Sequence, residues 1–407
     1  MFAFCLSATA QTETILHNFT GATNDGADPQ QVGLLALGGK FYGDTLFGGA
    51  NGLGAVFAMR PQSNGTWQVS VLYSFTDGND GKYPLGSLVA DSVGNLYGVA
   101  SFGGAFSAGV AYKLSKTSNG SWQLTVLWAF GGGGDAAYPF AGLAIDKSGN
   151  LYGTTTTGGL YGQGTVFELS PSSGGSWTEQ VLYSFGASAS DGINPYDPVI
   201  IDAAGNLYGT TAGGGSNSCD QFTLGCGTVF KLSPGTGGWT ETIIHYFENN
   251  GTDGFYTLAP LVMDPRGNLY GATQFGGGSS QCQFGGKTEG CGVVFKLSPM
   301  SSGAWAEHIL YTFTGGTSPS QPNSALTFDT AGNIYGETAF TSTSDGSVYR
   351  LTRSTSGQWG LTNLVNFNGT NGSNPQGGLI FGAGGHLFGT TVTGGASGLG
   401  VVFQITP

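Results

Sequence analysis

Gly94-Asn95-Leu96-Tyr97-Gly98 is a five-residue motif that recurs along the whole chain. Identical copies occupy residues 149–153, 205–209 and 267–271, and looser copies occupy 39–43, 332–336 and 385–389. The intervals between the last glycines of successive copies are 55, 55, 56, 62, 65 and 53 residues. Seven copies at a near-constant period indicate a repeat architecture, with one structural unit for each copy.

One unit, residues 135–185, shows what is repeated. Short apolar runs bounded by glycine and aspartate turns predict strands at 143–145, 151–156, 165–169 and 177–185. Four such strands form one antiparallel sheet, and radial repetition of four-stranded sheets is typical of a β-propeller. The sequence therefore predicts an all-β fold, a seven-bladed β-propeller.

The two ends of the chain complement each other. The last copy contains only three predicted strands, at 379–381, 387–391 and 401–405. Near the N-terminus, residues 12–19 (TETILHNF) match residues 240–247 (TETIIHYF), the fourth strand of the fourth unit. We expect this N-terminal strand to complete the last blade, because closure of the ring removes exposed strand edges.

Composition limits the class of protein. The 407 residues include 76 glycines, 13% aromatic residues and only 9% charged residues, which suits many short strands joined by tight turns. The end-to-end repeat favours one domain, residues 11–407, which we expect to be monomeric. A net charge of −12 disfavours nucleic acid or an anionic membrane as a partner. No apolar stretch reaches the ~18–20 residues that a membrane-spanning helix needs.

The first ten residues are apolar, then small, and end on Ala8-Thr9-Ala10, a pattern typical of the end of a secretory signal. We therefore interpret residues 1–10 as a signal-peptide remnant and expect a secreted or cell-surface protein. The basic n-region of such signals is missing, so the natural start can lie upstream. The alternative is a frayed apolar N-terminus.

The sequence motifs of the repeats resemble those of a known family. GNLYG, GTVFKLSP at 227–234 and VLYSF at 71–75 resemble the GloVer tandem repeats of secreted bacterial proteins, over nearly the whole chain. The resemblance implies export and a propeller-like array, and it implies no reaction. The Asp-x-x-Gly-Asn-Leu-Tyr turn is also similar, more weakly, to that of NHL-type propellers.

Residues that recur in most blades are predicted to be structural. Aspartate caps turns and glycine adopts positive φ, so a residue needed in every blade is a turn former rather than a catalyst. His17 and His245 occupy a position held elsewhere by Tyr or Trp, so we interpret them as core or rim residues and not as a metal pair. No H-E-x-x-H, C-x-x-C, Walker-type or G-x-S-x-G pattern is present, and we predict no metal and no cofactor. The aspartates concerned are Asp91, Asp146, Asp202, Asp264 and Asp329.

Blades 4 and 5 carry long connections between their second and third strands, each with two cysteines. Their matched placement in an exported chain predicts one local disulfide per loop, Cys219–Cys226 and Cys282–Cys291. A zinc site is the alternative, but six and eight intervening residues and the lack of clustered histidines argue against it.

The mouth of the predicted channel is asymmetric at the residue that follows the turn proline. One arc is apolar and aromatic and the other carries amides, a combination that suits the C–H faces and hydroxyl edges of a sugar. The apolar arc comprises Leu85, Phe140, Tyr196 and, in the matching slot of blade 5, Leu258; the amide arc comprises Asn323, Gln376 and Gln30. Ordinary surface variation is the alternative interpretation.

Two acids break the repeat in the second strand. Asp44 and Glu337 stand where the other blades place Val, Thr or Ala. A desolvated carboxylate has a raised pKa, and two acids held apart can act as general acid and as base or nucleophile. The alternative is that each pairs with a Lys or Arg or caps a backbone N–H, and blade 7 lies between them.

Three function hypotheses follow. The first is an exported propeller that binds a glycan or another extracellular polymer on its top face, the face that carries the second-to-third and fourth-to-first strand connections. The second is a polysaccharide-active enzyme, a glycoside hydrolase or lyase, that uses carboxylates on the same face. The third is a structural or protein-interaction propeller at the cell surface. Turnover of a polysaccharide distinguishes the second from the first, and absence of binding distinguishes the third.

Overall fold

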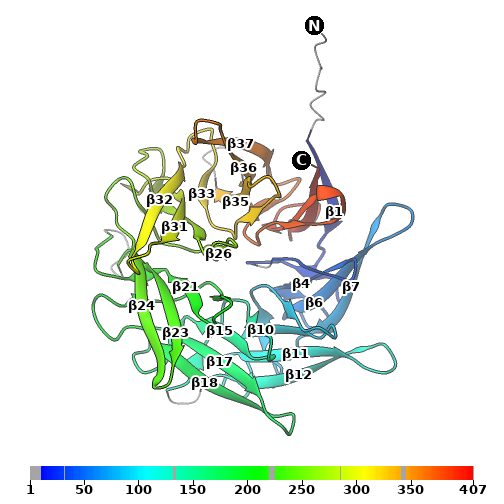
Figure 1. Cartoon of the computed structure of the whole chain (residues 1–407). Coiled ribbons are helices and arrows are strands. Elements are labelled where there is room, and N and C mark those ends of the chain that lie inside the picture. The colour runs from blue at the N-terminus through cyan, green and yellow to red at the C-terminus, as the bar shows by residue number, and fades with distance from the viewer. Residues whose placement is uncertain are drawn as a thin grey trace.

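The computed structural model describes residues 11–31, 33–131, 134–219, 225–284, 286–340 and 345–406. Its strands form seven antiparallel four-stranded blades arranged in a ring (Figure 1), which confirms the predicted β-propeller. The proposed signal remnant, residues 1–10, lies outside the described residues. In the described part of the chain the helical element is one 3-10 turn, η1 (Ala383–Gly385), and no helix there is long and apolar enough to cross a bilayer.

Within blades 1 to 6 the strands follow chain order from the inside of the ring to its rim (Figure 1). Blade 1 comprises β3 (Leu35–Leu37), β4 (Lys40–Thr45), β6 (Ala55–Pro61) and β7 (Trp67–Ser74). Blade 2 comprises β9 (Val89–Ala90), β10 (Leu96–Phe102), β11 (Val110–Lys116) and β12 (Trp122–Ala129). Blade 3 comprises β14 (Ala144–Ile145), β15 (Leu151–Thr155), β17 (Thr165–Pro171) and β18 (Trp177–Ser184). Blade 4 comprises β20 (Ile200–Ile201), β21 (Leu207–Thr211), β23 (Thr228–Gly235) and β24 (Gly238–Tyr246).

Blades 5 and 6 have the same order, and in blade 7 the N-terminal strand is outermost. Blade 5 comprises β26 (Val262–Met263), β27 (Leu269–Thr273), β31 (Val293–Pro299) and β32 (Trp305–Thr312). Blade 6 comprises β34 (Thr327–Phe328), β35 (Ile334–Phe340), β36 (Ser347–Arg353) and β37 (Trp359–Asn366). Blade 7 comprises β39 (Ile380–Phe381), β40 (Leu387–Thr393), β41 (Val401–Thr406) and the N-terminal strand β1 (Thr12–Asn18).

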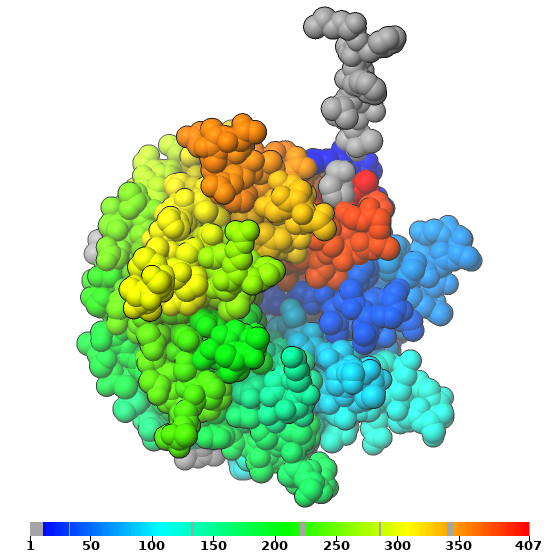
Figure 2. Space-filling model, in the orientation of Figure 1, coloured from blue at the N-terminus to red at the C-terminus, as the bar shows by residue number. Residues whose placement is uncertain are grey.

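The ring closes by pairing its two ends. β1 runs antiparallel to β41, with Thr12 opposite Thr406 and Asn18 opposite Val401. Figure 2 shows the blue N-terminal and red C-terminal parts of the chain side by side at this seam. The predicted completion of blade 7 by the N-terminal strand is therefore confirmed.

The repeated motif builds the turn between the first two strands of a blade. Asp91 accepts hydrogen bonds from the backbone N–H groups of Val93 and Asn95, from the Asn95 side chain and from the Tyr97 hydroxyl. Partial burial opposes ionisation of Asp91, but these hydrogen bonds outweigh it and lower the pKa of the carboxyl group. The prediction that these aspartates form turns is confirmed, since the same bonds recur at Asp146, Asp202, Asp264 and Asp329.

Adjacent blades pack through a repeated aromatic contact. The phenylalanine that follows each fourth strand is fully buried and meets the third-strand aromatic residue of the next blade edge-on or tilted. At the seam the pair is Phe19 and Phe57, whose ring centroids lie 5.4 Å apart. The other six pairs are Phe75–Tyr112, Phe130–Phe167, Phe185–Phe230, Phe247–Phe295, Phe313–Tyr349 and Phe367–Phe403.

The last glycine of the motif makes room for that third-strand aromatic residue. A Cβ atom on Gly153 would lie 2.5 Å from Cζ of Phe167. A larger residue at this position would displace the ring that fills the blade interface.

Short strands in the connections stiffen one face of the ring, which we call the top face. The connection that enters a blade pairs with the connection between its second and third strands. In blades 1, 3, 4 and 5 these pairs are β2 (Gly26–Ala27) with β5 (Phe47–Gly48), β13 (Ala136–Ala137) with β16 (Thr157–Gly158), β19 (Gly192–Ile193) with β22 (Gly213–Gly214), and β25 (Gly254–Phe255) with β28 (Phe275–Gly276). In blades 2, 6 and 7 the entering strands β8 (Lys82–Pro84), β33 (Ser320–Pro322) and β38 (Ser373–Pro375) pair directly with β10, β35 and β40. A further hairpin, β29 (Gln283–Phe284) with β30 (Lys287–Thr288), extends the long loop of blade 5.

Candidate functional site

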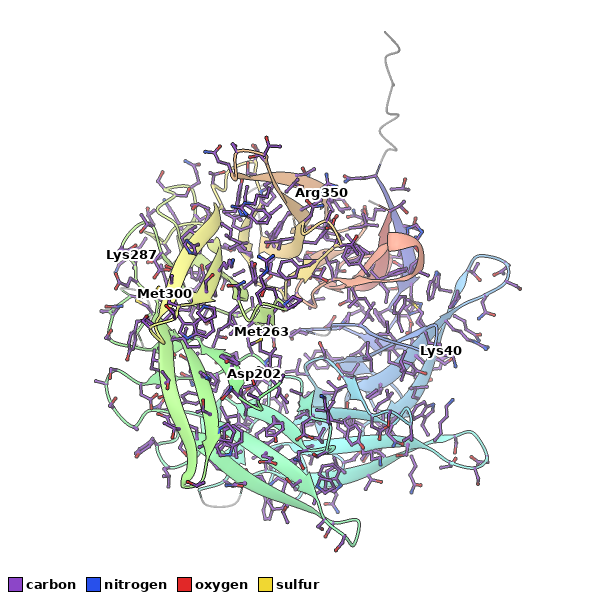
Figure 3. All side chains as sticks on the ribbon, in the orientation of Figure 1. Lys40, Asp202, Met263, Lys287, Met300 and Arg350 are labelled. Carbon is purple, nitrogen blue, oxygen red and sulfur yellow. A yellow bond between two sulfur atoms is a disulfide. The ribbon has the colours of Figure 1, made fainter. Side chains whose placement is uncertain are left out.

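A small cavity lies on the axis of the ring, where the connections entering all seven blades converge. It has a volume of about 50 Å³ and includes a residue from each of these connections. In Figure 3, Met263 of the inner strand β26 lies near the centre of the ring and Met300 lies at the rim. The residues that line it include Gln31, Phe140, Tyr196, Asp197, Leu258 and Gln376.

This volume holds a few water molecules or one small substituent. Two wider hollows of about 530 and 410 Å³ open at the rim, between blades 7 and 1 and between blades 3 and 4. The axial cavity remains the candidate site because aromatic, amide and carboxyl side chains converge there, which is typical of ligand sites.

A row of aromatic rings, the aromatic arc, crosses the top face from blade 1 to the axial cavity. Successive ring centroids lie 5.3 to 6.3 Å apart, and two members, Phe140 and Tyr196, line the cavity. The outer end is Phe47, which is 38% exposed. The arc comprises Phe47, Tyr83, Phe102, Tyr138, Phe140 and Tyr196.

The backbone is strained where it presents part of this arc. Tyr83 and Tyr138 precede the turn prolines of their connections and have φ values of 57° and 58°. Positive φ is costly for a bulky residue and persists only when neighbouring structure holds it. Here the N–H of Tyr83 donates to the carbonyl of Leu53, and that of Tyr138 donates to the carbonyl of Ala108, each in the preceding blade. The strain recurs at the equivalent positions of the other blades, so it belongs to the architecture and sets the direction of these side chains.

Asp197 brings a carboxyl group to the cavity. It is 5% exposed, and the Thr210 hydroxyl donates to its Oδ2 over 2.9 Å. Burial raises the pKa of Asp197 to about 7, and the Thr210 hydrogen bond opposes the shift only in part. The sequence analysis did not single out Asp197. The available signal was an acid one residue after Tyr196, where blade 1 has Gln31 and the remaining blades have small side chains such as Gly86, Ala141, Ala259 and Ser324.

The amides expected at the mouth are not all placed alike. Gln376 lines the cavity and donates to Asn374 Oδ1 over 3.2 Å. Asn323 is 8% exposed, and its Oδ1 is buried without a hydrogen-bond partner among the described residues. Gln31, rather than the neighbouring Gln30, contributes to the cavity wall. The structure thus brings Gln376 together with Phe140 and Tyr196, and places Gln30 and Asn323 outside the lining.

Asp44 is buried between blades 1 and 2. It is 1% exposed, and neither carboxyl oxygen has a hydrogen-bond partner from another described residue. Burial raises the pKa of Asp44 well above its ordinary value. The charge of Asp44 in turn raises the pKa of the buried Tyr112 hydroxyl, after desolvation, the larger cause.

Glu337 is fully buried between blades 6 and 7. The Gly378 N–H donates to its Oε2 over 2.8 Å, while Oε1 has no partner within the described residues. Burial raises the pKa of Glu337 to about 8, opposed by hydrogen bonds from Gly378 and Ser324. Glu337 therefore caps a backbone N–H, as the alternative interpretation proposed. Neither Asp44 nor Glu337 forms an ion pair with Lys or Arg in the described chain. Neither acid lines the axial cavity.

Both predicted disulfides are present, Cys219–Cys226 and Cys282–Cys291. The carbonyl groups of Cys226 and Cys291 accept the N–H groups of Tyr256 and Gln321, the positive-φ residues that enter the next blades. Each disulfide therefore holds a loop that anchors the following connection. Two disulfides indicate an oxidising environment.

Comparison with solved structures supports the fold alone. An ancestral GH74 enzyme is 11% identical with a TM-score of 0.57; the match covers 94% of this chain and 48% of that one, so this chain spans about half its length. A gluconolactonase from Xanthomonas campestris is 14% identical with a TM-score of 0.38, covering 74% of this chain and 82% of that chain. A glucose dehydrogenase is 11% identical with a TM-score of 0.43, covering 97% and 99%.

No curated protein matches the sequence. The Gloeobacter/Verrucomicrobia repeat, in contrast, matches three tandem segments, residues 2–146, 120–285 and 281–407. These segments span nearly the whole chain and include all seven blades. The chain therefore belongs to the Gloeobacter/Verrucomicrobia repeat family.

Proposed function

We propose that this protein is an exported monomer that binds a neutral glycan, or a similar polyhydroxylated polymer, on its top face. The observation that carries the proposal is the aromatic arc ending at a cavity that contains Asp197 and Gln376. Sugar C–H faces pack on aromatic rings, and amide and carboxyl groups exchange hydrogen bonds with hydroxyl groups. The two disulfides support export.

The dimensions favour a polymer lying across the face. A cavity of about 50 Å³ is too small for a sugar ring but accepts one hydroxyl or hydroxymethyl group. The arc extends outward from the cavity over several rings, so it offers further sugar residues a surface to stack on. A net charge of −12 favours a neutral or weakly basic polymer over a polyanion.

A panel of polysaccharides, scored by calorimetry for binding and by reducing-end assay for product release, tests this function. We expect binding without turnover, and weaker binding in Phe140→Ala, Tyr196→Ala and Gln376→Ala. Met300→Ala is a matched control, because Met300 is 45% exposed on the hairpin between β31 and β32, away from the top face. Full affinity in all three arc and cavity variants would contradict the proposal, and absence of any binding would favour a structural or protein-interaction role.

The second candidate is a polysaccharide hydrolase or lyase at the same face. Asp197 favours it, because a carboxyl group with a pKa of about 7 that lines a cavity is suited to proton transfer. Asp44 and Glu337 remain the proposed acid pair from the repeat pattern, although substrate contact would require the blades to open around them. Asp44→Asn, Glu337→Gln and Asp197→Asn separate the options: an acid that does the chemistry should lose ~10²–10⁴-fold in rate while ligand affinity is kept.

A further inference from the structure

Three side chains from two blades converge at the rim between blades 4 and 5. His245 lies on β24, Asp253 lies just before β25, and Glu307 lies on β32. His245 Nε2 is 3.1 Å from Asp253 Oδ2 and 3.5 Å from Glu307 Oε1. One possible ligand atom from each residue lies within 4.8 Å of the other two.

The cluster is held in place before any ligand binds. Asp253 is fixed by the N–H of Gly254, which donates to Oδ1 over 2.6 Å, and by the N–H of Glu248, which donates to Oδ2 over 3.0 Å. The imidazole of His245 meets the buried Phe247 ring edge-on, with centroids 4.9 Å apart. All three side chains are at least three-quarters buried, at 18%, 6% and 21% exposure.

The equivalent interface between blades 3 and 4 has a tyrosine in place of the histidine. Tyr183 occupies the position of His245, and its hydroxyl contacts Asp191 Oδ2 at 3.1 Å and Glu241 Oε2 at 2.9 Å. Replacing this phenol by an imidazole places a single nitrogen between two carboxylates. This nitrogen lies 3.5 Å from Glu307 Oε1, farther than the Tyr183 hydroxyl lies from Glu241, and Glu307 Oε1 is buried without a hydrogen bond among the described residues.

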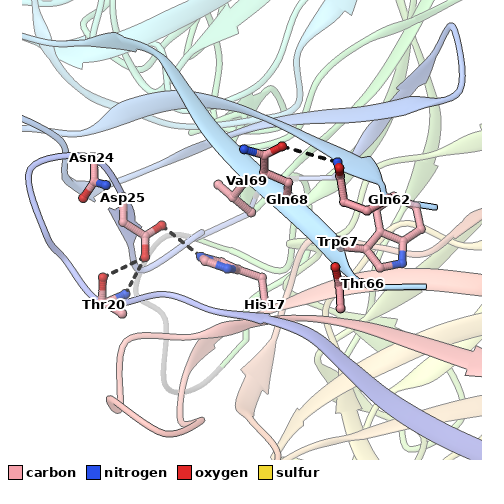
Figure 4. A pocket seen from close by; sticks show the side chains of 9 residues that line it. All are labelled: His17, Thr20, Asn24, Asp25, Gln62, Thr66, Trp67, Gln68 and Val69. Carbon is pink, nitrogen blue, oxygen red and sulfur yellow. Dashed lines mark hydrogen bonds and ion pairs between the residues drawn. The ribbon is translucent and has the colours of Figure 1, made fainter. Parts of the chain in front are cut away.

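The seam between blades 7 and 1 provides an internal comparison. His17 Nε2 lies 2.9 Å from Asp25 Oδ1, as His245 lies beside Asp253 (Figure 4). The third position, two residues after the tryptophan of the next blade, is Val69 here and Glu307 at the blade 4–5 interface. Within the described interfaces, only the one between blades 4 and 5 joins an imidazole to two carboxylates.

The two separations measured from the imidazole nitrogen fit a tetrahedral cation. Zinc binds imidazole nitrogen and carboxylate oxygen at ~2.0–2.2 Å, which separates neighbouring ligand atoms by roughly 3.3–3.6 Å in a tetrahedron. The two separations from His245 Nε2, 3.1 and 3.5 Å, lie close to this length. An imidazole with two carboxylates suits a borderline cation such as Zn²⁺, whereas Ca²⁺ and Mg²⁺ prefer oxygen ligands throughout.

We propose that His245, Asp253 and Glu307 bind one Zn²⁺-class divalent cation at the rim between blades 4 and 5. Three protein ligands leave the fourth position to water. Because the ligands come from β24, the adjoining connection and β32, the cation ties the fourth strand of one blade to that of the next. This site is independent of the glycan site on the top face.

Zinc binding to tag-free, chelator-treated full-length protein tests the proposal. We expect calorimetry and metal analysis after dialysis to find one Zn²⁺ per chain that Ca²⁺ does not displace, and Zn²⁺ to raise the melting temperature. His245→Tyr is the main variant, because tyrosine rebuilds the hydrogen-bonded network seen at Tyr183 and should preserve the fold. This variant and Glu307→Gln should bind Zn²⁺ at least tenfold more weakly.

His17→Ala is the matched control and should retain wild-type affinity for Zn²⁺. No zinc retained by the wild-type protein, Zn²⁺ affinity unchanged in His245→Tyr, or Ca²⁺ bound in preference to Zn²⁺ would each overturn the proposal. Loss of the site in His17→Ala to the same degree as in His245→Tyr would also overturn it, because the effect would then not be local to the three ligands.

Discussion

Replacing Glu337 by glutamine removes a titrating group from the blade 6–7 interface and keeps its shape. The Gly378 N–H can still donate to the side-chain oxygen of glutamine, as it does to Glu337 Oε2 at 2.8 Å. No counter-charge is lost, since Glu337 forms no ion pair in the described chain. The change therefore isolates the free energy of keeping this carboxyl group protonated.

The size of the effect on the free energy of unfolding follows from the difference in the pKa of Glu337 between the folded and unfolded states. The folded-state pKa of Glu337 is raised from 4.5 to about 8, so between these pH values the folded protein holds a proton that the unfolded chain has released. The wild-type free energy of unfolding should fall with rising pH throughout this window, by ~1.4 kcal/mol per pH unit from this group alone. Glutamine does not titrate, so the advantage of Glu337→Gln should grow from near zero at pH 4.5 to roughly 5 kcal/mol at pH 8, as an upper bound.

Urea unfolding of both proteins at pH 5, 6, 7 and 8 measures this advantage, with tryptophan fluorescence and circular dichroism compared to establish a two-state transition. The two proteins share every other titrating group, so the difference between them reports on Glu337. A difference that stays constant across these pH values, or that shrinks as pH rises, would refute the reasoning.

Three further changes test the rest of the structure. Asp44→Asn should also stabilise the protein increasingly as pH rises above 5, because burial raises the pKa of Asp44 in the same direction; urea unfolding at pH 5 and 8 checks this. Deleting residues 12–19 should lower the melting temperature or cause aggregation, because the deletion leaves β41 unpaired and removes the buried Phe19. Loss of a buried phenylalanine side chain lowers the free energy of unfolding by ~3–5 kcal/mol in Phe→Ala changes. An unchanged melting temperature would contradict closure by β1. Replacing Cys282 and Cys291 by serine should destabilise the protein by about 2–3 kcal/mol in the chain-entropy model, measured by thermal unfolding. Peptide mass mapping of the wild-type protein, purified without reductant, should find both disulfides, and free thiols at these cysteines would argue against them.

The number of blades, the order of their strands and the closure of the ring could be predicted from the sequence because each depends on local signals. The Gly-Asn-Leu-Tyr-Gly turn needs hydrogen bonds only within a few residues of Asp91 or its equivalents. Closure was visible as a fourth-strand sequence at residues 12–19 and a missing fourth strand at the other end. The disulfides followed from cysteines in matched loops, seven and nine residues apart.

The convergence of side chains from different blades was decided only by the tertiary structure. Asp197 and Gln31, each two residues after the turn proline of its connection, line the axial cavity and Gln30 does not, and this became visible only where the seven entering connections converge on the axis. His245 meets Glu307 because the fourth strands of neighbouring blades lie side by side at the rim, although 62 residues separate them in sequence. A repeat pattern reveals which residues depart from the average blade. Which departures face one another depends on the twist and packing angle between blades, and these are set by the buried aromatic contacts of the whole ring.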